Sequence, residues 1–174
     1  MMGKTYKFCP ICSAQLVEKW IELEDKKRLR CSSCDFIYYQ NPTPAAGIVL
    51  VEDGKVLMVK RKYPPRVDMW TLPAGFVEVY EDAGTCAVRE AKEETNLDVE
   101  VTRIFNAYSA FDDPRAAVVL VMYLTRKIGG ELMCGDDASD ARFFALNDLP
   151  DNIAFRAHEM ALADIMKQHA DGLL

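Results

Sequence analysis

The segment that most constrains this chain is a charged cluster, Arg89-Glu90-Ala91-Lys92-Glu93-Glu94, inside a proline-free run rich in Ala, Glu and Lys. These residue types favour a helix, so the run predicts one over residues 81–95, preceded by a loop through Pro73-Ala74-Gly75. A helix advances about 100° per residue, which places Glu90, Glu93 and Glu94 within one arc of about 100°. Three carboxylates are therefore expected on one helix face.

Three acids near the end of a helix oppose its stability. Like charges at i,i+4 destabilise a helix by about 0.2–0.5 kcal/mol, and acids in the last turn also oppose the helix dipole. One interpretation is a cation held among the carboxylates, since hard ions such as Mg²⁺ take oxygen ligands. The other is a solvated acidic face relieved by Arg89, which can pair with Glu93 at i,i+4. The six residues alone favour neither interpretation.

The wider pattern around this cluster favours the cation. Gly75 is followed after five residues by Glu81, and after seven more by Arg89-Glu90-Ala91-Lys92-Glu93-Glu94-Thr95-Asn96-Leu97. This arrangement resembles the Nudix box, Gly-x5-Glu-x7-Arg-Glu-U-x-Glu-Glu-x-Gly-U, in which U is aliphatic. Asn96 replaces the last glycine, and asparagine is the next residue best able to adopt the left-handed conformation at a helix end. The loop–helix–loop geometry is therefore expected to be kept.

The resemblance implies a fold and a chemistry. The fold is an α/β/α sandwich around a mixed β-sheet, and the reaction is hydrolysis of the diphosphate of a nucleoside diphosphate linked to another group. The catalytic cation, Mg²⁺ or Mn²⁺, would be bound by Glu90, Glu93 and Glu94 with a backbone carbonyl near Gly75. Such cations neutralise diphosphate charge, lower the pKa of a bound water and align it for in-line attack.

The same resemblance implies roles for other acidic residues. Arg89 and Glu81 would orient the metal-binding groups. Glu94 would help to deprotonate the attacking water, with a base from outside the helix as the alternative.

Many family members draw a further acidic ligand from a glutamate before an Ala-x-aromatic-aromatic stretch, matched here by Asp140-Ala141-Arg142-Phe143-Phe144. Asp140 is shorter than glutamate and could act through a water. Asp136 and Asp137 are rivals, and a polar turn before a strand is the alternative for each.

Four of the six cysteines form two pairs, Cys9-Pro10-Ile11-Cys12 and Cys31-Ser32-Ser33-Cys34, separated by eighteen residues. This spacing is typical of a four-cysteine zinc ribbon. Four thiolates leave no open position on the metal, so the zinc is expected to be structural. About 35 residues cannot bury a sufficient core, so zinc would supply most of the folding free energy.

The prolines of Asn41-Pro42-Thr43-Pro44 mark a domain boundary, which predicts a zinc ribbon over residues 1–41 and a Nudix hydrolase domain over residues 42–174. In the second domain, Asp53-Gly54 joins two strand-like runs, residues 47–51 and 55–61, as a hairpin. Periodicity predicts further strands at residues 99–105, 117–124 and 141–144 and a closing helix over residues 155–169.

Composition excludes several classes of protein. The longest apolar runs, residues 45–51 and 116–124, are far below the roughly 20 residues that a membrane-spanning helix needs. The first residues show no secretory signal, so we expect a cytoplasmic protein.

A net charge of −6 argues against general nucleic-acid affinity. Residues 1–40 hold seven basic and five acidic residues, too weak a basic patch for a nucleic-acid-binding ribbon. Protein contact, as in a homodimer, is the expected use of the ribbon.

The combination of four cysteines, Asp35-Phe36-Ile37-Tyr38-Tyr39-Gln40-Asn41-Pro42 and the box resembles the zinc-ribbon Nudix proteins, which include NADH pyrophosphatase and relatives acting on ADP-ribose or FAD. NADH pyrophosphatases carry a Ser-Gln-Pro-Trp-Pro-Phe-Pro-x-Ser segment after the box, where this chain has Tyr108-Ser109-Ala110-Phe111-Asp112-Asp113-Pro114-Arg115. We therefore expect a nucleotide substrate, ADP-ribose or FAD, with release of AMP. NADH or an NAD-type RNA cap is the alternative.

The substrate pocket is predicted from side-chain chemistry. Aromatic rings can stack on adenine or flavin, a contact worth about 1–3 kcal/mol, and arginines can grip phosphate. The aromatic candidates are Tyr39, Phe76, Tyr108 and Phe111, and the arginines are Arg61, Arg66 and Arg115. For each, core packing or ordinary surface exposure is the alternative. His158 and His169 fall on the predicted last helix and are not expected to act in catalysis.

A different class of function remains open at this point. A zinc-ribbon adaptor with an idle box would bind a macromolecule and show no metal-dependent turnover. The intact glutamates favour the enzyme.

Overall fold

The computed structural model describes residues 6–135 and 137–174. The chain divides into two compact units, one ending at Pro42 and the other running from Thr43 to Leu174. The units have separate sets of buried side chains, so each is described by itself.

The first unit is a three-stranded antiparallel sheet in the order β1-β2-β3. Its elements are β1 (Leu16–Ile21), the 3-10 turn η1 (Glu22–Glu24), β2 (Lys26–Cys31) and β3 (Ile37–Tyr38). Its fully buried apolar side chains are few: Cys9, Leu16 and Cys31. Units of under about 40 residues usually make up for so small a core with disulfides or a metal.

The second unit is built on a mixed sheet whose main path runs β10-β5-β4-β9-β8. The central pair, β4 and β9, is parallel, and the pairs on either side are antiparallel. Two short strands, β6 and β7, pair with β5 and β4. The strands are β4 (Thr43–Glu52), β5 (Lys55–Arg61), β6 (Trp70–Thr71), β7 (Ala74–Phe76), β8 (Asp98–Ala110), β9 (Val118–Gly129) and β10 (Ala138–Ala145).

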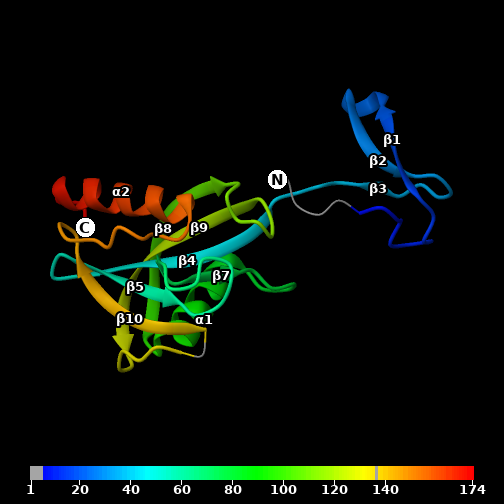
Figure 1. The fold of residues 1–174 in the computed structure, drawn as a ribbon. Helices are drawn as coiled ribbons and strands as arrows, with labels where there is room; N and C mark the ends of the chain where they lie inside the picture. Colours follow the sequence, from blue (N-terminus) through cyan, green and yellow to red (C-terminus); the bar gives the residue numbers. More distant parts are fainter. Residues whose placement is uncertain (1–5, 136) are drawn as a thin grey trace. The chain divides into compact units, whose positions relative to one another are not determined.

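Two helices, α1 (Ala83–Thr95) and α2 (Arg156–Ala170), cover opposite faces of this sheet (Figure 1). Alternate residues of β4 face opposite sides, so one strand serves both cores. Ile48 and Leu50 pack with α1, whereas Ala45 and Val49 belong to the core under α2. The predicted α/β/α sandwich with a mixed sheet is confirmed.

The local predictions hold where the turn chemistry is strong. Asp53 and Gly54 have φ values of 49° and 70°, the positive values that a tight hairpin between β4 and β5 requires. Asn96 ends α1 in the left-handed conformation with φ 57°, as the replaced glycine predicts. The helix starts later than predicted, because Asp82 caps it by accepting a hydrogen bond from the Thr85 amide.

Neither helix, nor any other in the described part of the chain, is long and apolar enough to cross a membrane.

Tyr108 lies in the core of the second unit. The predicted strand at residues 99–105 continues as β8 to Ala110, which makes Tyr108 a strand residue with 4% of its surface exposed. Its hydroxyl donates a hydrogen bond of 2.7 Å to Asp164 of α2. Tyr108 therefore fastens α2 to the sheet and does not line the cavity described below.

We predict that Tyr108→Phe lowers the free energy of unfolding by about 1–2 kcal/mol, because it removes a largely buried hydrogen bond to a charged acceptor. Denaturant unfolding measures this change. Since the ring stays in the core, KM for any substrate should match that of the unchanged protein. A raised KM with unchanged stability would instead make Tyr108 a substrate contact.

Candidate functional site

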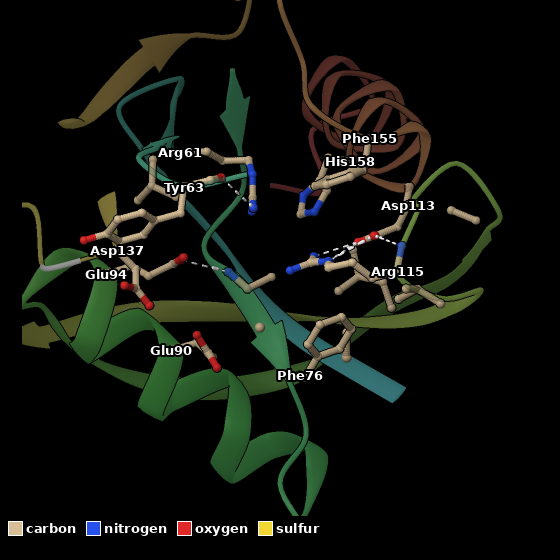
Figure 2. Close-up of a pocket in the computed structure, with 18 of the residues that line it drawn as sticks. Arg61, Tyr63, Phe76, Glu90, Glu94, Asp113, Arg115, Asp137, Phe155 and His158 are labelled. Carbon is tan, nitrogen blue, oxygen red and sulfur yellow. Dashed lines mark hydrogen bonds and ion pairs between the residues drawn. The ribbon is translucent and has the colours of Figure 1, made fainter. Parts of the chain in front are cut away.

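A cavity of about 350 Å³ lies in the second unit, at the low end of the usual range for small-ligand sites. Figure 2 shows its two different ends. Glu90 and Glu94 lie on the α1 side, whereas Phe155 and His158 lie on the α2 side. Arg61 and Arg115 project into the space between the two ends. The cavity thus joins an acidic end to a more apolar end through two guanidinium groups.

Arg89 organises the acidic face of α1. It pairs with Glu81 at 2.8 Å, Glu90 at 2.7 Å and Glu93 at 3.0 Å. It also donates to the carbonyl of Phe76 in β7, at 3.2 Å. The hydrogen bonds from Arg89 hold the pKa of Glu81 at about 2. Arg89 therefore ties the helix to the strand beside it and offsets one of the negative charges on this face.

Glu94 is the carboxylate that Arg89 does not reach. It accepts a hydrogen bond of 3.0 Å from the Ala74 amide. Removal from solvent, with the nearby charge of Glu90 second, raises the pKa of Glu94 to about 8. Burial also raises the pKa of Glu90. Carboxylates with raised pKa values in a cavity are typical of sites that bind a cation or move a proton.

Gly75 is required by the close approach of α1 to β7. A Cβ atom added there would lie 2.1 Å from the carboxylate of Glu90, so a side chain would displace it. The carbonyl of Gly75 also faces the buried thiol of Cys86, at 3.8 Å. Gly75 and Glu90 thus share one small space at the acidic end.

These residues fit a divalent cation by their chemistry. Glu90, Glu94 and Asp137 all line the cavity and offer the hard oxygen donors that Mg²⁺ and Mn²⁺ prefer. A cation there would supply the positive charge that Glu94 lacks. One oxygen of Glu90 and one of Glu93 accept hydrogen bonds from Arg89.

The three aspartates proposed as a further ligand differ in position. Asp137 lines the cavity, just before β10. Asp140 lies within β10, forms an ion pair with Arg142 and is absent from the cavity lining. Asp136 lies outside the described residues.

Arg61 lines the cavity with a guanidinium group that hydrogen-bonds backbone carbonyl oxygens. It donates to the carbonyl oxygens of Pro65 at 2.9 Å and Tyr63 at 3.4 Å, and its guanidinium lies over the ring of Phe155. Within the described residues it pairs with no carboxylate. Burial, with the neighbouring charge of Arg115 second, lowers its pKa. A partly buried cation without a counter-ion is stabilised by a bound anion.

Arg115 is paired but still faces the cavity. Its guanidinium bonds Asp113 at 2.7 Å and lies over the ring of Phe76. Both Phe76 and Arg115 line the cavity, as predicted candidates for base and phosphate contact.

Two other predicted pocket residues of the second unit do not line the cavity, and a third belongs to the first unit. Phe111 is 79% exposed and does not line the cavity. Arg66 pairs with Asp112 at 3.2 Å and is also outside the lining. Tyr39 belongs to the first unit, where its hydroxyl donates to Glu24 at 2.7 Å.

Sequence reasoning missed several residues that line the cavity: Tyr63, Asp112, Phe155 and His158. Asp112 and Tyr63 stand in loops whose path no periodicity reveals. His158 falls on a predicted helix and is not expected to act in catalysis, and only the packing of α2 shows that it faces the cavity.

In the first unit, the sulfur atoms of Cys9, Cys12, Cys31 and Cys34 all lie within 4.8 Å of one another. The shortest separations are 3.4 Å between Cys12 and Cys31, 3.6 Å between Cys12 and Cys34, and 3.7 Å between Cys9 and Cys34. A tetrahedron with Zn–S bonds of about 2.3 Å has edges of about 3.8 Å. Backbone N–H groups, with that of Ser33 first, hold the pKa of Cys31 at about 6. The spacing of the four sulfur atoms therefore matches that of a tetrahedral zinc site.

We predict that Cys31→Ser lowers the zinc content from about one ion per chain to nearly none, because three thiolates bind structural zinc far more weakly than four. Elemental analysis of the purified protein measures this content. Cys134→Ser is the matched control, since Cys134 is exposed and outside the cluster. Equal zinc in both variants would show that the four cysteines hold no metal.

The chain is similar to proteins with known activities. It is 40% identical over 151 residues to an ADP-ribose pyrophosphatase of Methanocaldococcus jannaschii, covering 86% of this chain and 84% of the relative. It is 30% identical over 175 residues to an NAD-capped RNA hydrolase NudC of Vibrio atlanticus, of whose length it spans only 61%. A crystal structure of a NUDIX hydrolase from Nitrosomonas europaea matches with a TM-score of 0.83 and 31% identity, over 96% of this chain and 94% of that one.

Two family models match the chain. The model described as Nudix N-terminal, a zinc ribbon, matches residues 7–40. The model of the NUDIX domain matches residues 41–164, well over half of the chain. The protein therefore belongs to the Nudix hydrolases, as the box at Gly75 to Leu97 implies.

Proposed function

We propose that this Nudix hydrolase cleaves the diphosphate of ADP-ribose, with Mg²⁺ or Mn²⁺ as the catalytic cation, and releases AMP and ribose 5-phosphate. The observation that carries the proposal is the order of charges along the cavity. Three carboxylates, Glu90, Glu94 and Asp137, line one end, and Arg61 and Arg115 follow. A diphosphate bridging a cation and two arginines would complete the charge balance of both.

Glu90, Glu94 and Asp137 are the residues proposed to hold the cation, with Glu93 joining once it leaves Arg89. A bound cation would neutralise charge on the diphosphate and acidify the attacking water. Glu94 is proposed to accept the proton of that water, because it lines the acidic end of the cavity and does not pair with Arg89. Arg89 and Glu81 keep α1 against β7, and Arg61 and Arg115 bind the phosphoryl oxygens.

ADP-ribose is preferred as the substrate on two grounds. The relative from Methanocaldococcus jannaschii, which this chain matches over most of both lengths, is named an ADP-ribose pyrophosphatase. The segment Tyr108 to Arg115 also lacks the pattern that the resemblance implies for NADH pyrophosphatases. NAD-capped RNA and NADH are the comparison substrates, because NudC relatives are named NAD-capped RNA hydrolases. FAD is a third, because the sequence also favours it.

We predict Mg²⁺- or Mn²⁺-dependent release of AMP from ADP-ribose, with a higher kcat/KM than for FAD, NADH or NAD-capped RNA. Removing the general base should lower kcat by about 10²- to 10⁴-fold, so Glu94→Gln is the test variant. Chromatography of the products measures AMP. Glu159→Gln on the exposed side of α2 is the control and should keep full activity. No turnover of any of the four substrates would overturn the proposal.

Gly75→Ala tests the contact between α1 and β7. The added methyl group has to push the Glu90 carboxylate aside, and a misplacement of about 1 Å in a catalytic group can cost 10²-fold in rate. We predict a loss of about 10- to 100-fold in kcat with a small change in thermal stability, because the displaced group is a flexible side chain.

The matched control is Gly84→Ala, whose added Cβ approaches no atom closer than 3.3 Å. It should retain activity. If Gly75→Ala is as active as Gly84→Ala, the position of Glu90 does not limit the reaction.

A further inference from the structure

We propose that the α2 end of the cavity reads the adenine base of the substrate, with His158 as the hydrogen-bond donor and the carboxylate of Asp112 as the acceptor. The inference rests on the proposed function, since it names the residues that choose the base of the nucleoside diphosphate. It concerns selectivity alone and leaves the reaction at the α1 end unchanged.

His158 presents one fixed donor to the cavity. Its Nδ1 atom accepts a hydrogen bond of 3.3 Å from the Leu72 amide. A neutral imidazole that accepts at Nδ1 carries its proton at Nε2. Burial, with the charge of Arg61 second, lowers the pKa of His158 to about 4, so the ring is neutral at pH 7. No hydrogen bond in the described part of the chain uses Nε2, and the ring lines the cavity (Figure 2).

Asp112 also lines this cavity and contacts the start of α2. Its Oδ2 accepts from the backbone amide of Arg156, the first residue of α2, at 3.1 Å and from Arg66 at 3.2 Å. Its Oδ1 is buried and has no hydrogen-bond partner among the described residues. A buried carboxylate oxygen without a donor costs free energy, which a ligand amino group would remove. Asp112 also lines the cavity, and its charge acts on His158.

The walls beside this pair suit a flat, apolar ring. The lining there is made by small and apolar side chains: Ala110, Val118, Leu120, Phe155 and Ala157. The ring of Phe155 is 7% exposed and lies under the Arg61 guanidinium, which fixes its plane. The neutral Nε2–H of His158 on such a wall suits an uncharged ring nitrogen better than a phosphate. The phosphates are proposed to bind Arg61 and Arg115.

Adenine offers an acceptor and a donor that a donor and an acceptor at one end of the cavity can bind together. On both of its hydrogen-bonding edges a ring-nitrogen acceptor stands next to the N6 amino donor. Hypoxanthine carries a carbonyl oxygen in place of that amino group, so an acceptor would face the carboxylate of Asp112. A buried acceptor left facing another acceptor is strongly disfavoured. The pair should therefore select adenine over hypoxanthine.

The test compares ADP-ribose with inosine diphosphate ribose. We expect the unchanged protein to favour ADP-ribose in kcat/KM by roughly 5- to 150-fold, the range for a good bidentate base contact. In Asp112→Asn the amide can still accept from Arg156 and Arg66 but also donates to a carbonyl, so this preference should fall at least 5-fold. Asp151→Asn, at an exposed position, is the matched control and should keep the preference.

Titration calorimetry of the same two ligands, on the Glu94→Gln variant with Mg²⁺, gives a readout that needs no turnover. A tighter Kd for ADP-ribose supports the inference, and equal values overturn it. If Asp112→Asn does not fold, His158→Gln replaces it and should also reduce the preference. Failure of all hydrolysis refutes the proposed function, whereas hydrolysis without preference for the base refutes only the reading of adenine.

Discussion

The close contact between α1 and β7 is the constraint on which the acidic end of the cavity depends. There is no room for a Cβ atom between Gly75 and the Glu90 carboxylate, and Arg89 spans the remaining distance to the strand carbonyl of Phe76. This contact brings Glu94 to the Ala74 amide and away from solvent. The raised pKa of Glu94 is therefore a consequence of how helix and strand pack.

Much of the fold could be predicted because its signals are local. The hairpin at Asp53 and Gly54, the helix end at Asn96 and the four-cysteine spacing each depend on residues close in sequence. The α1 side of the site could also be predicted from the sequence, since its glutamates are spaced along one helix. β8 extends beyond the predicted strand at residues 99–105, because its exposed and buried positions do not alternate regularly and register shifts interrupt its pairing with β9.

The α2 side of the site could not be predicted, for a physical reason. Asp112, Tyr63 and His158 come from two loops and a helix that are far apart in sequence, and the cavity exists only where they meet. A buried histidine on a helix with an apolar face has the pattern of a core residue. Its role depends on the Leu72 amide taking one ring nitrogen, which is a tertiary contact. Tyr108 is the opposite case: the sequence offers it as a pocket residue, whereas the structure shows it in the core, where it anchors α2.

The placement of the helices on opposite faces of the sheet has a consequence for how such enzymes diversify (Figure 1). Glu90 and Glu94, proposed to hold the cation, belong to the layer of α1, whereas His158, proposed to contact the base, belongs to the layer of α2. Substitutions at the start of α2 can therefore alter which nucleotide is accepted while the reaction machinery on α1 stays intact. A lineage could change its substrate by drift in one layer, without passing through inactive intermediates.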